Sequence, residues 1–226
     1  MLRSLVGRVR AHPLITLHLG SQVVATGGFC GNFTTTIQHA DGGRSIVQHG
    51  ATILATGAQE YRGPDYGYGS DPRILTQQEF EARLAAGGDL PRSVVMIQCV
   101  GPAERFCSRI CCTVALKNAL ALKQRRPDAQ VMILYRDIRT YGFKERLYTG
   151  ARAAGVLFAR YDDAHRPQVT AEGDLTIRAW DPALRRDLLL RPDLLVLSMP
   201  VVPRQDAQQV AGLFKASLDG DGFFLE

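Results

Sequence analysis

The chain has 226 residues, of which 46% are hydrophobic and 22% are charged; this ordinary composition for a folded protein excludes a disordered chain. Its 27 Lys and Arg against 22 Asp and Glu give a net charge of +5, and the basic residues are scattered, which argues against a nucleic-acid partner. No run of about 18 apolar residues and no signal-peptide core occurs, so we expect a cytoplasmic protein without a membrane span.

The first sixty residues predict one helix followed by a mainly antiparallel sheet. Apolar residues at helical spacing form one stripe of an amphipathic helix near the N-terminus. Asp41-Gly42-Gly43 has the composition of a hairpin turn. Strand-like segments cover residues 15–20, 21–27, 29–38, 44–50 and 51–57.

A loop and a short helix follow this sheet. Glycine and proline are frequent in residues 63–71, which predicts a loop. Thr76 and Glu79 fit the N-cap and the third helical position of a capping box, and Gly87-Gly88 ends the helix. We therefore expect residues 63–90 to be a linker that contains one short helix.

From residue 91 onward, strands and helices alternate. The predicted strands are residues 93–99, 131–136 and 156–161, and the helices between them are 108–125 and 143–154. This order implies an α/β fold with a parallel sheet and right-handed crossovers. The remaining predicted elements are strands near 168–170, 175–181 and 194–200 and a helix near 207–214.

Four of the five cysteines lie within fourteen positions, in the segment QCVGPAERFCSRICCT. These are Cys99, Cys107, Cys111 and Cys112. Cys99 ends a predicted parallel strand, where open α/β sheets bind ligands, and Cys111 is one helical turn after Cys107. Arg105, Arg109 and the amides of a helix N-terminus would offset the negative charge of the thiolates.

The spacing of these cysteines leaves the kind of metal centre open. Four thiolates suit either an all-cysteine zinc site or a [4Fe–4S] cluster. Zinc sites usually have two separated pairs of cysteines, which this sequence lacks, so the spacing mildly favours the cluster. Four small buried residues without a metal are the remaining alternative. Cys30 stands alone in a predicted strand and is expected to be a buried structural thiol.

A second signal is the segment ILATGAQEYRG, residues 53–63. An apolar strand that ends in Ala55-Thr56-Gly57 lets the backbone approach a flat ligand, because glycine has no side chain. No G-x-G-x-x-G motif follows a predicted strand, so a complete dinucleotide phosphate loop is absent. Two interpretations fit a further group of residues near the end of a predicted strand. They could bind an anion or the edge of a flavin, or they could form a surface salt-bridge network. These residues are Arg136, Asp137, Arg139, Tyr141 and Lys144.

At these residues the chain resembles the A subunit of heterodisulfide reductase, which is the flavin and iron–sulfur component of an electron-bifurcating complex. The matching segments are GNFTTTI, ILATGAQEYRG, VMIQCVG, FCSRICCTVALKNALALK, ILYRDIRTYGFKE, GVLFARYD, PDLLVLSM and DGFFLE. The resemblance implies a thioredoxin-reductase-like core and FAD contacts from Ala55, Thr56 and Gly57. It also implies a [4Fe–4S] cluster near the flavin, held by Cys99, Cys107, Cys111 and Cys112.

The resemblance also implies a domain organisation. Residues 1–62 would be a partial FAD-binding segment with a β-meander, and residues 63–90 the linker. Residues 91–200 would form an inserted Rossmann-like domain of the nicotinamide-domain type that carries the cysteines, and residues 201–226 would return toward the FAD domain. The family's amino-terminal G-x-G-x-x-G segment and its carboxyl-terminal flavin and ferredoxin-like segments are absent, and SMPVVP stands where the family has Ser-Thr-Gly before a proline. We therefore expect a truncated chain or one part of a split gene.

The function that the resemblance implies is electron transfer between FAD and a [4Fe–4S] cluster. Its partners would be other heterodisulfide reductase-like subunits and a donor such as ferredoxin or a hydrogenase or dehydrogenase subunit. One alternative is an NAD(P)H-dependent flavoprotein disulfide reductase, which would need the missing phosphate loop. The other alternative is a zinc-stabilised interaction module without enzymatic activity.

Overall fold

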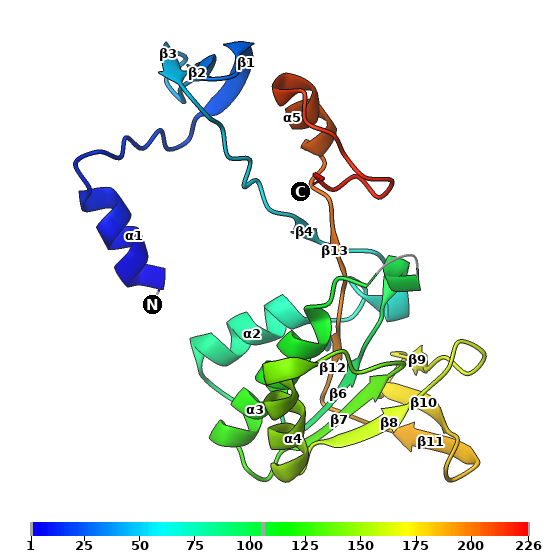
Figure 1. Cartoon of the computed structure of the whole chain (residues 1–226). Coiled ribbons are helices and arrows are strands. Elements are labelled where there is room, and N and C mark those ends of the chain that lie inside the picture. The colour runs from blue at the N-terminus through cyan, green and yellow to red at the C-terminus, as the bar shows by residue number, and fades with distance from the viewer. Residues whose placement is uncertain (1, 105–106, 226) are drawn as a thin grey trace. The chain divides into compact units, whose positions relative to one another are not determined.

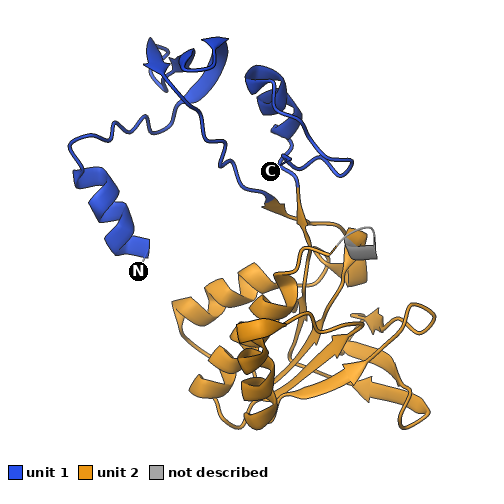
Figure 2. Cartoon of the chain, in the orientation of Figure 1, with its two compact units in different colours: residues 1–58, 203–226 blue, residues 59–202 orange. Residues whose placement is uncertain are grey.

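The computed structural model describes residues 2–104 and 107–225 of the chain. The chain divides into two compact units (Figure 2). Unit 1 comprises Met1–Ala58 and Pro203–Glu226, and unit 2 comprises Gln59–Val202. Among the described residues, no helix has the length and apolar character needed to cross a bilayer.

Unit 2 is built on a five-stranded parallel sheet, which confirms the predicted α/β class. Its strands in spatial order are β5 (Ile74–Thr76), β12 (Leu194–Leu197), β6 (Ser93–Ile97), β7 (Gln130–Tyr135) and β8 (Leu157–Arg160). One face is covered by the helices α2 (Gln77–Ala86), α3 (Cys111–Arg125) and α4 (Glu145–Ala153) (Figure 1). The other face packs against an antiparallel sheet of β11 (Arg186–Leu190), β10 (Thr176–Asp181) and β9 (Gln168–Thr170).

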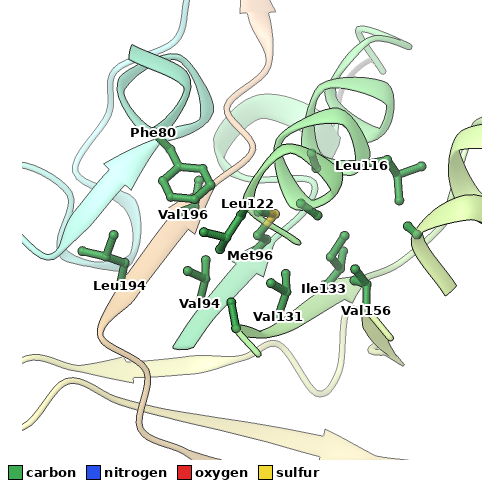
Figure 3. Packing of buried hydrophobic residues seen from close by; sticks show 14 of the residues in the cluster. Phe80, Val94, Met96, Leu116, Leu122, Val131, Ile133, Val156, Leu194 and Val196 are labelled. Carbon is green, nitrogen blue, oxygen red and sulfur yellow. The ribbon is translucent and has the colours of Figure 1, made fainter. Parts of the chain in front are cut away.

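The parallel strands contribute to two hydrophobic cores, because successive residues of a strand point to opposite faces of the sheet. In β6, Val94 and Met96 belong to the core under the helices, whereas Val95 and Ile97 belong to the core under the antiparallel sheet. Figure 3 shows Val94 and Met96 in the core that also contains Phe80 of α2. The sheet is therefore buried on both faces, as is usual for parallel strands.

Residues 63–90 are an integral part of unit 2, whereas the sequence predicted a linker for this segment. β5 pairs with β12 at the edge of the parallel sheet, and α2 contributes the buried side chains of Phe80 and Leu84 to the core. The predicted capping box is confirmed, since the Thr76 hydroxyl accepts from the Glu79 N–H and the Glu79 carboxylate accepts from the Thr76 N–H. The glycine- and proline-rich composition of residues 63–71 predicts a loop, and it gives no sign that β5, a strand of only three residues, follows that loop.

Several short elements were not expected from the sequence. β11 completes the antiparallel sheet of unit 2 by pairing with β10. The strands β4 (Gln59–Glu60) and β13 (Val201–Val202) pair where the chain enters and leaves unit 2. Single 3₁₀ turns occur at Asp65–Gly67, Gly101–Glu104 and Gly142–Lys144.

Unit 1 contains a three-stranded antiparallel sheet and two helices. The strands are β1 (Gln22–Phe29), β2 (Asn32–Gln38) and β3 (Arg44–His49), and the helices are α1 (Leu2–Ala11) and α5 (Ala207–Phe214). The Thr26 hydroxyl in β1 donates a hydrogen bond to the Leu213 carbonyl in α5, so distant parts of the sequence meet within this unit. The apolar stripe of the predicted amphipathic helix lies on α1 and is exposed at Leu2, Leu5 and Val6.

Two predicted strands, residues 15–20 and 51–57, are wrong, because both segments are irregular in the structure. A strand forms when its backbone groups pair with a neighbouring strand, and no described strand pairs with either segment. Their side chains reflect this lack of pairing, since Leu19 and Ile53 are exposed, Ile53 at 90%. An apolar run shows that a segment is suited to a strand, but it does not show that a neighbouring strand is present to pair with it.

Gly101, two residues after Cys99, is needed for close packing. It has a φ of +61°, and a Cβ there would lie 2.4 Å from Cε1 of Tyr61. We expect Gly101→Ala to lower the free energy of unfolding by about 2 kcal/mol, because left-handed backbone strain and a clash add together. Urea unfolding monitored by circular dichroism measures the loss.

Gly142→Ala is the matched control for this substitution. Gly142 has a φ of +64°, but nothing lies within 4 Å of its Cβ position. Its substitution should therefore cost only the backbone strain, about 1 kcal/mol. Equal losses in the two variants would contradict a packing role for Gly101.

Candidate metal centre

A cavity of about 350 Å³ lies at the carboxyl ends of β6 and β7 in unit 2. Its walls include residues that directly follow these two strands, among them Gln98 and Arg136. The four clustered cysteines all line it: Cys99, Cys107, Cys111 and Cys112. Open α/β sheets bind their ligands at this edge. The fold therefore brings the four predicted metal ligands to one cavity.

Strand and helix termini position these cysteines. Cys99 follows β6 and has a φ of +58°, in the left-handed region that favours glycine. Cys111 and Cys112 are the first two residues of α3. The Cys107 thiol accepts a hydrogen bond from the Arg109 N–H at 3.4 Å. The partial positive charge of the α3 N-terminus favours negatively charged sulfur at this position.

Burial disfavours the thiolate form of the two cysteines on α3. It raises the pKa of Cys111 to about 12, and the charges of Cys112 and Cys107 add to this shift. Burial also raises the pKa of Cys112. The two thiols lie 3.6 Å from the carbonyl oxygens of Met199 and Asp137, respectively. A positively charged group in the cavity, such as a metal centre, would stabilise both as thiolates.

The four thiols lie around one cavity without converging on a single point. Zinc holds its cysteine ligands at about 2.3 Å, which requires four sulfur atoms to converge on one point. Within residues 2–104 and 107–225, no group of three or more Cys, His, Asp or Glu side chains converges in this way. The four cysteines instead surround a cavity of about 350 Å³.

Arginine and aspartate side chains form the polar wall of the cavity. Arg136 pairs with Asp163 at 2.7 Å and also reaches the Cys99 thiol, and these hydrogen bonds raise the pKa of the Arg136 guanidinium. Asp137 lies 3.6 Å from Arg139 and 4.0 Å from Arg160. Of the five residues in the predicted site, Asp137 and Arg139 pair with each other, whereas Arg136 pairs with Asp163 outside that set.

The remaining basic and aromatic residues of the predicted site differ in position. Arg109 lines the cavity, as predicted for a residue that offsets thiolate charge. Tyr141 and Lys144 are exposed and do not line it. Arg105 lies outside the described residues.

Curated relatives match the chain over most of its length. The A subunit of the ferredoxin:CoB-CoM heterodisulfide reductase of Methanosarcina acetivorans is 31% identical over 226 aligned positions, which cover 78% of this chain and 28% of that protein. The iron-sulfur A subunit of the CoB–CoM heterodisulfide reductase of Methanocaldococcus jannaschii is 34% identical, covering 78% of this chain and 30% of that protein. The chain belongs to the heterodisulfide reductase A family. It spans less than a third of the length of these relatives, which are oxidoreductase subunits.

Solved structures of flavoprotein oxidoreductases share the fold of the chain. The bacillithiol disulfide reductase Bdr of Bacillus cereus has a TM-score of 0.52 at 14% identity and covers 100% of this chain and 62% of its own. Thioredoxin reductase of T. acidophilum has a TM-score of 0.50 at 13% identity, covering 91% of this chain and 59% of its own. These likenesses confirm the thioredoxin-reductase-like fold expected of the heterodisulfide reductase A family. No protein-family model matches the chain.

The segment that the family resemblance assigns to FAD lies in unit 1. Ala55 and Thr56 line a groove of about 760 Å³, together with side chains of the β1–β3 sheet and of α5. Gly57 has a φ of +69° and does not line this groove. The groove lies beside a second, smaller pocket of unit 1, which has a volume of about 330 Å³ and shares Thr35, His49 and Leu213 with it.

The prediction that Cys30 is a buried structural thiol is wrong, because this residue is exposed. Cys30 and Gly31 form the turn between β1 and β2, and Gly31 has a φ of +84°. Hairpin turns lie at the edge of a sheet and face solvent. The family resemblance does not include Cys30 among the metal ligands, so it serves as a control for experiments on the other four cysteines.

Two further cavity residues were not predicted from the sequence. Tyr161 is buried and donates a hydrogen bond from its hydroxyl to the Gln98 carbonyl at 2.5 Å. Burial raises the pKa of the Tyr161 hydroxyl, which therefore remains a donor at neutral pH. Both residues line the cavity with the cysteines. The only signal in the sequence was their place at the ends of two predicted parallel strands.

Proposed function

We propose that the chain holds a [4Fe–4S] cluster through Cys99, Cys107, Cys111 and Cys112 and serves in electron transfer. The observation that carries this proposal is the meeting of four cysteines at one cavity on the ligand-binding edge of a parallel sheet. A bound cluster would supply one-electron oxidation and reduction. The names of the relatives support the proposal, since one of them is an iron-sulfur subunit.

The residues of the chain have separate tasks in this proposal. The thiolates bind iron, and Cys99 on the strand side lines the cavity together with the two cysteines that begin α3. Arg136 and Arg139 offset the negative charge of the thiolates and the cluster, which stabilises both in a partly buried site. Carboxylates of Asp137 and Asp163 hold these guanidinium groups in place.

We extend the proposal to FAD, with Ala55 and Thr56 on the groove of unit 1 and the adjacent Gly57 as contacts. The relatives are at least three times as long as the matched segment, so other parts of the family's polypeptide, or other subunits, would complete the flavin site. The proposed electron path runs between this flavin and the cluster. Proposed partners are heterodisulfide reductase-like subunits and a donor such as ferredoxin or a hydrogenase or dehydrogenase subunit. We place the assembly in the cytoplasm, where cysteine thiols stay reduced and available for a cluster.

Anaerobic reconstitution with iron and sulfide tests the cluster. The chain should acquire about four iron and four sulfide per polypeptide and a broad visible absorbance that dithionite bleaches. The same preparation is analysed for zinc, and FAD binding is followed by quenching of flavin fluorescence. A colourless chain with one zinc per polypeptide would refute the cluster and would favour the zinc-stabilised module. Cluster uptake without FAD binding would support the cluster and assign the flavin to the assembled complex.

A further inference from the structure

Gln98 has a buried side chain whose amide makes no hydrogen bond. The residue is 0% exposed, and neither Nε2 nor Oε1 has a partner in the part of the chain that the structure describes. A buried amide without a partner is unfavourable, so native proteins contain few of them. Gln98 lines the cysteine cavity and directly precedes Cys99. The residue with the unpartnered amide is thus part of the wall of the candidate metal centre.

The backbone of Gln98 is held from two sides. Its N–H donates to the Leu134 carbonyl at 2.9 Å, and its carbonyl accepts from the Tyr161 hydroxyl at 2.5 Å. The alternation along β6 places its side chain on the same face of the sheet as Met96, which is the face that α3 covers. Because α3 begins with two of the four cysteines, the free amide is held on their side of the sheet.

A second buried glutamine in the same unit shows the usual arrangement. Gln77 is 3% exposed, and its Nε2 donates to the Ser198 hydroxyl at 3.2 Å. Its Oε1 accepts from the Asn118 amide at 2.8 Å. Gln77 does not line the cysteine cavity. The fold therefore satisfies a buried amide in its core, whereas the amide at the cavity is left with free donors.

We propose that Gln98 donates an amide N–H to a sulfur of the cluster or of its thiolate ligands and thereby raises the reduction potential of the cluster. This inference rests on the proposed cluster. Reduction adds an electron, which makes the sulfur atoms more negative and better acceptors. A donor at this position therefore stabilises the reduced form more than the oxidised form, and hydrogen bonds to sulfur are among the features that set cluster potentials.

The test is a redox titration of the reconstituted full chain, monitored by electron paramagnetic resonance. Gln98→Leu keeps the approximate size of the side chain and removes its donors. It should bind the same amount of iron and sulfide, while the ratio of reduced to oxidised cluster at a fixed potential falls about tenfold, ~59 mV for a one-electron couple. Gln98→Glu should lower the ratio less than Gln98→Leu, because burial keeps its carboxyl protonated and the remaining O–H is still a donor.

Gln77→Leu is the matched control, since it removes a buried glutamine that already has partners. It should lower the melting temperature of the chain and leave the reduction potential unchanged. Before reconstitution, Gln98→Leu should have the opposite effect and leave the melting temperature equal or higher, because it removes an unpartnered buried amide.

Two results would overturn the inference, and they are distinguishable. If the unaltered chain takes up iron and sulfide but neither Gln98→Leu nor Gln98→Glu changes the reduction potential, the role of Gln98 is refuted while the cluster stands. If the unaltered chain takes up no iron and sulfide, the proposed cluster fails and the role of Gln98 fails with it. A potential that falls in the order Gln, Glu, Leu supports the inference.

Discussion

The Cys99→Gly variant is expected to lose the cluster while the chain remains folded. After anaerobic reconstitution, its iron content should fall from about four atoms per chain to below one, since one iron lacks its protein ligand. Cys99 has a φ of +58°, which glycine adopts without the penalty of about 1–2 kcal/mol that other residues incur. Before reconstitution, the free energy of unfolding of Cys99→Gly should therefore lie within about 1 kcal/mol of the unaltered chain, or above it.

This combination separates a metal ligand from a structural thiol. Strained backbone is retained in proteins where function requires the side chain at that place. Metal analysis and visible absorbance measure the cluster, and urea unfolding measures stability. Cys30→Ser is the control, because this exposed cysteine lies outside the cavity and its substitution should leave iron content unchanged. Full iron retention in Cys99→Gly would contradict the assignment of Cys99 as a ligand.

The Phe80→Ala variant is expected to lose about 3–5 kcal/mol of the free energy of unfolding of unit 2. Phe80 is 0% exposed and belongs to the core that α2 and α3 form on the parallel sheet. Removing its ring leaves a cavity that the surrounding helices and strands fill only in part. Urea unfolding monitored by circular dichroism measures this loss.

Phe143→Ala is the control of the same residue type. Phe143 is 89% exposed, so its substitution should change stability by no more than about 0.5 kcal/mol. If residues 63–90 were a loose linker, Phe80→Ala would resemble this control. A large loss confined to Phe80→Ala would show that α2 is part of the folded core.

Local signals in the sequence were sufficient for much of unit 2. The capping box at Thr76 and Glu79 depends on residues three positions apart, so the sequence contains all of its determinants. The alternation of strands and helices after residue 91 likewise predicts the parallel sheet, because crossover connections obey a nearly invariant handedness. The strand pattern of residues 93–99 predicted that Cys99 ends a strand, and the helix predicted from residue 108 begins at Cys111 in the structure.

The features decided by tertiary structure are those that depend on a partner distant in sequence. Residues 51–57 are apolar enough for a strand, but no described strand pairs with them. β5 joins the sheet only because β12, more than a hundred residues later, lies between it and β6. Cys30 is exposed because it falls in a turn, whose position depends on the register of β1 and β2.

The candidate metal centre depends on both kinds of information. The sequence by itself determined which four cysteines are grouped, and the family resemblance implies that they are the ligands. Only the fold brought Arg136, Tyr161 and Gln98 to the same cavity, from the ends of three strands that are neighbours in space. The burial of the Gln98 amide without a partner depends on side chains packed around it in three dimensions, which no spacing in a single sequence encodes.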